Sequence, residues 1–149
     1  MEYSAEARQR LTEVCEGLRL VAYPDPGTGG APWTIGYGHT GADVYEGLTC
    51  TSEQADTWLL DDVQSAVNAV NVHVTVAITQ HQFDALVDFA FNCGAGNFES
   101  STLLELLNAG NAAGADEQFA RWVRGGGHIL PGLVKRRALE AAWFNTEDA

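Results

Sequence analysis

Positive charge is scarce in this sequence. It contains 8 lysine and arginine residues against 20 aspartate and glutamate residues, which gives a formal net charge of −12 at pH 7. The phosphate backbone repels such a chain, so nucleic acid is not expected as a partner. The basic residues are concentrated in the last 29 residues, at Arg121, Arg124, Lys135, Arg136 and Arg137. Their pattern fits either contact with an anionic ligand or a solvated helix face.

Long hydrophobic runs are missing from the start of the chain. The opening residues, MEYSAEARQRLTEVCEG, carry a charged or polar side chain every few positions. This is neither the hydrophobic region of a secretory signal nor a membrane span. We therefore expect a protein made in the cytoplasm that does not insert into a membrane.

Cysteine and histidine are also few. Three cysteines, Cys15, Cys50 and Cys93, are an odd number at wide spacing, which favours reduced thiols over a Cys50–Cys93 disulfide. The histidines show no metal-ligand spacing, so neither a metal nor another cofactor is expected. They are His39, His73, His81 and His128.

The 149 residues, 46% of them hydrophobic, suffice for one domain with a sizeable core. Apolar residues recur at helical spacing after Ser4, a favoured N-cap residue, and predict a helix over residues 5–15. Between Leu20 and Tyr45, turn residues and short alternating runs predict a small antiparallel sheet. No other segment is predicted to form strands.

The rest of the chain has helical patterns. Capping boxes in TSEQ and TQHQ begin two helices, a long one ending near residue 71 and another expected to end at Gly94 and Gly96. The stretch HVTVAI is expected to be an extended connector between them. Further helices are predicted over SSTLLELLNAG, DEQFARWV and PGLVKRRALEAAWF, with a glycine turn at 125–127. The fold class is therefore α+β, mainly helical.

Two acids and a threonine stand near the predicted sheet. Glu16 lies at the end of the first helix, Asp25 follows nine residues later, and Thr34 lies in WTIGYGHT. An isolated pair of acids at this distance is common on protein surfaces and is weak evidence of a site. Thr34 alone fits an ordinary strand residue.

Four blocks in order resemble the phage-type lysozymes, or endolysins, of glycoside hydrolase family 24, and they extend over nearly the whole chain. The blocks are EGLRLVAY, WTIGYGHT, QFDALVDFAFNCGAGNFESSTLL and RWVRGGGHILPGLVKRRALEAAWF. The resemblance implies a single lysozyme-like domain over 1–149. A sheet lobe (about 16–50) and a helical lobe (about 72–149, with the N-terminal helix packed on it) would be joined by a helix over about 51–71, with the active-site cleft between the lobes.

The same resemblance implies a lysozyme that hydrolyses the β-1,4 bond between N-acetylmuramic acid and N-acetylglucosamine, with inversion. Glu16 would be the general acid, because a helix C-terminus and desolvation both favour a protonated carboxyl. Asp25 and Thr34 would position water. Thr34 follows the second acid by nine residues instead of the family's usual six, because the segment PGTGGAP lengthens the loop.

Substrate contacts implied by the resemblance are Thr40, Phe91, Asn92 and Ser101. Aromatic and amide groups suit N-acetyl sugars. Phe91 fits the apolar face of its own helix equally well.

Further polar residues have implied partners. By analogy with the family, His39 would form a structural ion pair with Asp62 or, as second choice, Asp61. Arg136 and Arg137 could lie near the active-site acid or bind wall-peptide carboxylates, and Glu140 is a rival partner one turn away. Cys15 fits a small apolar residue at the helix end, although its oxidation would obstruct Glu16.

Two functions compete. The first is a monomeric endolysin that binds and cleaves peptidoglycan glycan strands after release from the cytoplasm of the producing host. The second is a catalytically degenerate module of the same fold that binds peptidoglycan or a protein partner. The presence of Glu16, Asp25 and Thr34 together favours the enzyme.

Overall fold

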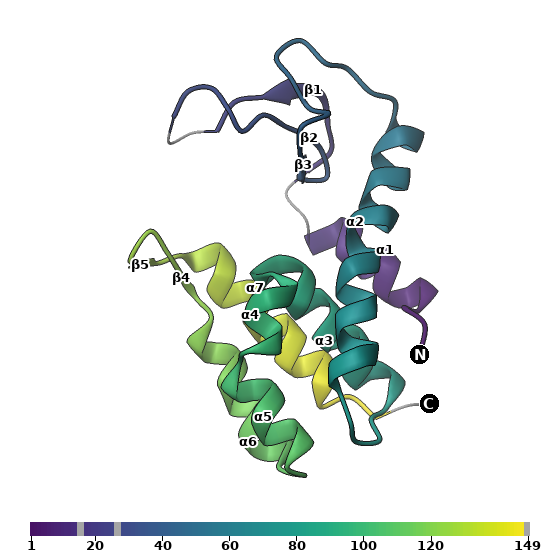
Figure 1. Cartoon of the computed structure of the whole chain (residues 1–149), viewed down its shortest axis with the longest axis vertical. Coiled ribbons are helices and arrows are strands. Elements are labelled where there is room, and N and C mark those ends of the chain that lie inside the picture. The colour runs from purple at the N-terminus through teal and green to yellow at the C-terminus, as the bar shows by residue number, and fades with distance from the viewer. Residues whose placement is uncertain (15–16, 26–27, 148–149) are drawn as a thin grey trace. The chain divides into compact units, whose positions relative to one another are not determined.

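The computed structural model describes residues 1–14, 17–25 and 28–147, which form two compact units (Figure 1). The helical unit comprises Met1–Ala7 and Ser65–Ala149, and the sheet unit comprises Arg8–Gln64. Helix α1 (Ala5–Val14) agrees with the helix predicted over 5–15.

The sheet unit contains a three-stranded antiparallel sheet. Its strands, in the order β1-β2-β3, are β1 (Arg19–Tyr23), β2 (Thr34–Gly36) and β3 (His39–Thr40). Ala22, Ile35 and Val44 form its core, with Trp33, Leu48, Cys50 and Trp58 packed against them. The predicted small sheet is therefore confirmed, although its strands are short.

One turn of this sheet requires glycine. Gly36 has a φ of +66°, and a Cβ atom there would lie 3.2 Å from the Cβ atom of Ala55. A side chain would combine a strained backbone with a close contact to the following helix. Gly36 therefore allows β2 to turn toward β3 while remaining packed on that helix.

Helix α2 (Ser52–His73) is the predicted long helix. Its capping box is present: the backbone N–H of Gln54 donates to Thr51 Oγ1 at 3.1 Å, and the backbone N–H of Thr51 donates to Gln54 Oε1 at 2.9 Å. One face is buried, at Ala55, Leu59, Val63, Ala66, Val67 and Val70. Residues up to Gln64 belong to the sheet unit and those from Ser65 to the helical unit.

The helical unit is built around α3 (Gln80–Cys93), which α7 (Pro131–Phe144) packs against. Phe89 of α3 makes edge-to-face contacts with Phe98, Phe119 and Trp122 at centroid distances of 6.3, 5.6 and 5.4 Å. The capping box at Thr79 and Gln82 is present as predicted. The short helices α4 (Ala95–Glu99), α5 (Thr102–Asn108), α6 (Ala112–Gln118) and the 3₁₀ helix η1 (Phe119–Arg121) complete the unit.

Three details of the predicted helical region are wrong. Gly94 ends α3 as expected, but Gly96 lies inside α4. Helix α6 begins earlier than predicted, because Asn111 caps it by accepting from the N–H of Gly114 at 2.8 Å, and it passes into η1. The glycine turn is present, but it joins two strands that were not predicted, β4 (Arg124–Gly125) and β5 (His128–Ile129), which form a second antiparallel sheet.

The β4–β5 hairpin depends on its glycines. Gly126 and Gly127 have φ values of +58° and +81°, which suit a two-residue hairpin turn. Two-residue strands leave no alternating pattern in the sequence, so only the turn could be predicted.

Two further predictions concern thiols and membranes. Cys50 and Cys93 are free cysteines, as favoured from their spacing, whereas Cys15 lies outside the described residues. Within the part of the chain that the structure describes, none of the helices combines the length and hydrophobicity that a membrane crossing needs.

Candidate active site

The expected general acid, Glu16, lies outside the described residues, whereas Asp25 lies within them. Asp25 is half-buried, and its backbone closes the base of the loop between β1 and β2. Its N–H donates to the carbonyl of Gly30 at 3.0 Å, and its carbonyl accepts from the N–H groups of Thr28 and Gly29 at 3.2 and 2.8 Å. The hydroxyl of Thr28 donates to the carbonyl of Ala31 at 2.8 Å, which further ties the loop together. These bonds fix the backbone from which the Asp25 carboxyl projects.

Thr34 and Thr40 lie directly opposite each other. They are partners in the β2–β3 pair, and Thr34 also pairs with Tyr23 of β1. Directly opposed residues of antiparallel strands place their side chains on the same face of a sheet. Thr34 is half-buried and Thr40 is exposed, whereas Ile35 between them in the chain is fully buried. The structure therefore brings the predicted water-positioning and sheet-side substrate residues together.

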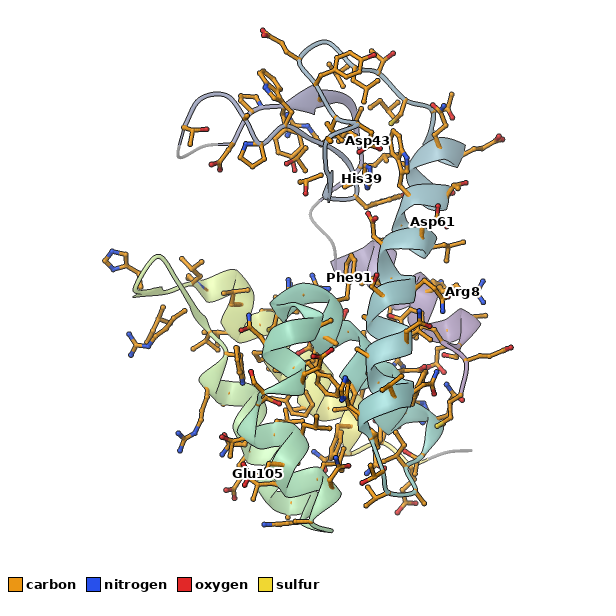
Figure 2. The ribbon with its side chains drawn as sticks, viewed as in Figure 1. Arg8, His39, Asp43, Asp61, Phe91 and Glu105 are labelled. Carbon is orange, nitrogen blue, oxygen red and sulfur yellow. The ribbon has the colours of Figure 1, made fainter. Side chains whose placement is uncertain are left out.

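His39 is held between two carboxylates. Its Nδ1 atom lies 2.8 Å from Asp62 Oδ2, and its Nε2 atom lies 2.9 Å from Asp43 Oδ2. Figure 2 shows His39 and Asp43 side by side in the sheet unit. The ring also stacks on Trp58, with centroids 4.7 Å apart and an interplanar angle of 6°.

The contact with Asp62 is the one that the sequence analysis expects, and Asp61 beside it on α2 is exposed. Asp43 was missed, because its contact with His39 depends on the turn that follows β3. Burial lowers the pKa of His39, but the hydrogen bonds to Asp43 and Asp62 outweigh it and raise that pKa above 6.5. The hydrogen bond to His39 lowers the pKa of Asp43 in turn.

The expected substrate residues of the helical unit have different surroundings. Phe91, labelled in Figure 2, lies in the last turn of α3 and is half-buried, and Asn92 beside it in the chain is exposed. Ser101 is buried and caps α5, because its hydroxyl accepts from the N–H of Leu104 at 3.1 Å and donates to the carbonyl of Phe98 at 2.7 Å. This capping accounts for the serine in structural terms, and its contact with substrate stays a prediction.

A cluster of buried charges joins α3 to α7. Arg136 donates from Nη2 to Asp88 Oδ1 at 2.8 Å and from Nε to Asp88 Oδ2 at 3.2 Å. Arg137 donates from Nη2 to Glu140 Oε2 at 2.8 Å and to Asn92 Oδ1 at 2.7 Å. Of the alternatives open from the sequence, the structure shows Glu140 as the partner of Arg137.

Burial shifts the pKa of two groups beside these arginines, Glu140 and Cys93. It raises the pKa of Glu140 well above its ordinary value, and the neighbouring Asp88 raises it further despite the two arginines. Burial also raises the pKa of the Cys93 thiol to about 11, although Arg137 donates a hydrogen bond to its sulfur. The Cys93 thiol is therefore protonated at neutral pH.

Across residues 1–14, 17–25 and 28–147, the structure brings together no group of three or more His, Cys, Asp or Glu side chains that could hold a metal ion.

Comparison with known proteins gives related endolysins. The endolysin of Bacillus phage PZA is 49% identical over 142 residues, which cover 95% of this chain and 55% of that protein. The chain spans about half the length of the two curated Bacillus phage relatives that it matches, those of PZA and B103.

Solved structures match over nearly the full chain. The muramidase domain of SpmX from Asticaccaulis excentricus has a TM-score of 0.87 and 37% identity, covering 98% of this chain and 99% of that one. The endolysin from Escherichia coli O157:H7 phage FAHEc1 has a TM-score of 0.86 and 37% identity, covering 97% and 94%. The fold is thus the mainly helical, lysozyme-like α+β fold with a small antiparallel sheet. The sequence model of the phage lysozyme family matches residues 13–140, and with these relatives it shows that the chain belongs to the phage lysozyme family.

Proposed function

We propose that the chain is an endolysin-type lysozyme, which hydrolyses the β-1,4 bond between N-acetylmuramic acid and N-acetylglucosamine in bacterial peptidoglycan. The observation that carries this proposal is the family match over residues 13–140, which includes Glu16, Asp25 and Thr34. No cofactor takes part in the proposed reaction. The protein acts as a monomer on glycan strands of the wall, after release from the cytoplasm in which it is made.

The proposed reaction needs a proton for the leaving oxygen and a nucleophile for the anomeric carbon. Glu16 donates the proton as general acid. Asp25 activates a water molecule as general base, and the hydroxyl of Thr34 holds that water because it can both accept and donate a hydrogen bond. The direct attack of water inverts the configuration of the anomeric carbon.

The described geometry is consistent with these roles. The loop that carries Asp25 is closed by backbone hydrogen bonds, so the carboxyl starts from a defined position. Thr34 is fixed by pairing with both neighbouring strands. A threonine between two paired strands has little freedom to move, as a residue that positions water should. Thr40, Phe91, Asn92 and Ser101 are the proposed substrate contacts.

The first test measures reducing ends released from purified peptidoglycan by the wild-type chain, by Glu16→Gln and by Glu46→Gln. Loss of general acid catalysis should reduce the rate by roughly 10²- to 10⁴-fold in Glu16→Gln. Glu46 is an exposed acid of the sheet unit, so Glu46→Gln makes the same charge change and should keep the wild-type rate. No release by a folded wild-type chain would favour the glycan-binding module instead.

The stereochemistry has its own test. NMR spectroscopy of the first product should show the anomer opposite to that of the substrate. In inverting enzymes the two carboxyl groups are about 6.5–9.5 Å apart, against about 5–5.5 Å in retaining ones. A retained anomer would assign Asp25 the role of covalent nucleophile and would contradict the water mechanism.

A further inference from the structure

The side chain of Asn92 is tied to a buried arginine. Asn92 lies in the last turn of α3 and is exposed, whereas Arg137 of α7 has only 1% of its surface exposed and Glu140 has none. One nitrogen of the arginine, Nη2, reaches both neighbours, at 2.7 Å from Asn92 Oδ1 and 2.8 Å from Glu140 Oε2. A surface amide is thus connected to a buried ion pair.

The arginine itself is held on several sides. Its Nε atom lies 2.6 Å from Glu140 Oε1, its Nη1 donates to the sulfur of Cys93, and its guanidinium carbon lies 5.4 Å from the centre of the Phe89 ring. A planar guanidinium with these contacts cannot turn without breaking several of them. The Nη2 atom therefore offers Asn92 a donor in a fixed position.

An arginine donor settles which way an asparagine amide faces. The amide has an acceptor oxygen and a donor nitrogen of nearly the same shape, and a half-turn of the side chain exchanges them. Arg137 has no acceptor, so only the oxygen of Asn92 can turn toward it. The Nδ2 group is then the one turned away, and among the described residues it has no hydrogen-bond partner.

We propose that Arg137, held by Glu140, is a positioning residue that fixes the Asn92 amide so that its Nδ2 group donates to an acceptor oxygen of an N-acetylated sugar. This inference rests on the proposed function for the identity of the ligand. It gives the buried Arg137–Glu140 pair of α7 a role in substrate affinity in addition to packing. Arg137 touches no substrate and acts only through Asn92.

The central variant is Asn92→Asp. It keeps the side-chain shape and gives Arg137 a carboxylate partner, so the thermal midpoint should stay equal or rise. It also removes the outward N–H donor, so KM for peptidoglycan should rise about tenfold with kcat little changed, because one net hydrogen bond is lost. Asn111→Asp is the matched control, since it adds the same charge to the helical unit and keeps the oxygen that caps α6. It should leave KM unchanged.

A double-mutant cycle separates positioning from structure. Arg137→Lys keeps the charge but loses the planar fork, so KM should rise in the wild-type background. In the Asn92→Ala background the same change should leave KM where Asn92→Ala alone put it, because the amide to be positioned is gone. An Arg137→Lys effect of equal size in both backgrounds would overturn the proposal.

A binding measurement makes the result independent of turnover. The side-chain amide NMR signals of Asn92 are followed while glycan strands freed of stem peptides are added to the Glu16→Gln chain. The signals should shift when the strands are added to the Glu16→Gln chain. They should not shift when the same chain also carries Arg137→Lys. Signals that do not move in the presence of Arg137 would overturn the inference, and they would do so even if peptidoglycan is cleaved. A wild-type chain that shows the shift but releases no reducing ends would contradict only the proposed function.

Discussion

The protonation of His39 should make the stability of the folded chain depend on pH. Its pKa in the folded chain lies above 6.5, because Asp43 and Asp62 bind both ring nitrogens. Folding therefore favours the protonated ring. The stabilisation is complete below pH 6.5, the ordinary value, and is lost as pH rises through the folded pKa.

The matching prediction compares the wild-type chain with His39→Gln. The wild-type thermal midpoint should fall, relative to that of the variant, as pH increases above 6.5. Thermal unfolding followed by circular dichroism at several pH values measures this difference. His128→Gln, at an exposed position of β5, should keep the wild-type pH profile. Parallel profiles of thermal midpoint against pH for wild type and His39→Gln would show that the two carboxylate contacts contribute nothing to the pH dependence of stability.

Residues also differ in how far their roles could be predicted. Family analogy predicts the contact of His39 with Asp62 on α2. The matching sequence blocks point to Asp25 and Thr34 as residues of the candidate site. The link between Asn92 and Arg137 could not, because the two are 45 positions apart in the chain and meet only when α7 packs on α3. Contacts between distant segments leave no local signal in a single sequence.

At the scale of elements, the stability of the interface between α3 and α7 depends on buried charges as well as on apolar packing. Glu140 is fully buried and contacts Arg137 within its own helix, while Arg136 reaches Asp88 of α3. Removing one member of a buried ion pair leaves an uncompensated charge in the interior. Any neutral replacement of Glu140 should therefore destabilise the interface, and a polar one should do so less because its oxygen can still accept a hydrogen bond from Arg137.

We predict that Glu140→Ala lowers the free energy of unfolding by about 3–5 kcal/mol, because Arg137 is left buried without a counter-charge. Glu140→Gln should cost less, since its amide oxygen can still accept from Arg137. Chemical denaturation measures both changes. Glu105→Ala, at the exposed α5 position labelled in Figure 2, should stay within about 0.5 kcal/mol of wild type. A loss for Glu140→Ala no larger than that for Glu105→Ala would exclude the charge-based explanation.

The elements themselves were predictable where their signals are local. Capping boxes and apolar periodicity located α2 and the start of α3 closely, because the groups that define a helix end lie within four residues of each other. The strands β4 and β5 and the helix α4 were missed. They are too short for periodicity, and tertiary contacts decide their conformation.

At the scale of the whole molecule, the formal charge of −12 opposes the approach to an anionic wall that the proposed function requires. The repulsion acts over about one Debye length, roughly 10 Å at 0.1 M salt. We predict that hydrolysis of intact peptidoglycan increases from low to moderate salt as the repulsion is screened. Reducing-end release at graded sodium chloride concentrations measures it.

A substrate freed of stem peptides, and therefore less anionic, is the control for this prediction. Its cleavage should depend much less on salt, since there is little repulsion to screen. A rate on intact peptidoglycan that only declines as salt is added would indicate that attraction dominates, with the basic residues between Arg121 and Arg137 as its natural source.

The two compact units also bear on the order in which the chain can be completed during synthesis. The helical unit is discontinuous: it joins Met1–Ala7 to residues from Ser65 onward, and the hydroxyl of Ser4 donates to Asp84 at 2.6 Å. Met1–Ala7 therefore leave the ribosome well before their partners in the helical unit are made, while Arg8–Gln64 can close over its own core in the meantime. Translation thus completes the sheet unit before the helical unit, which closes around a segment that was made earlier than the sheet unit.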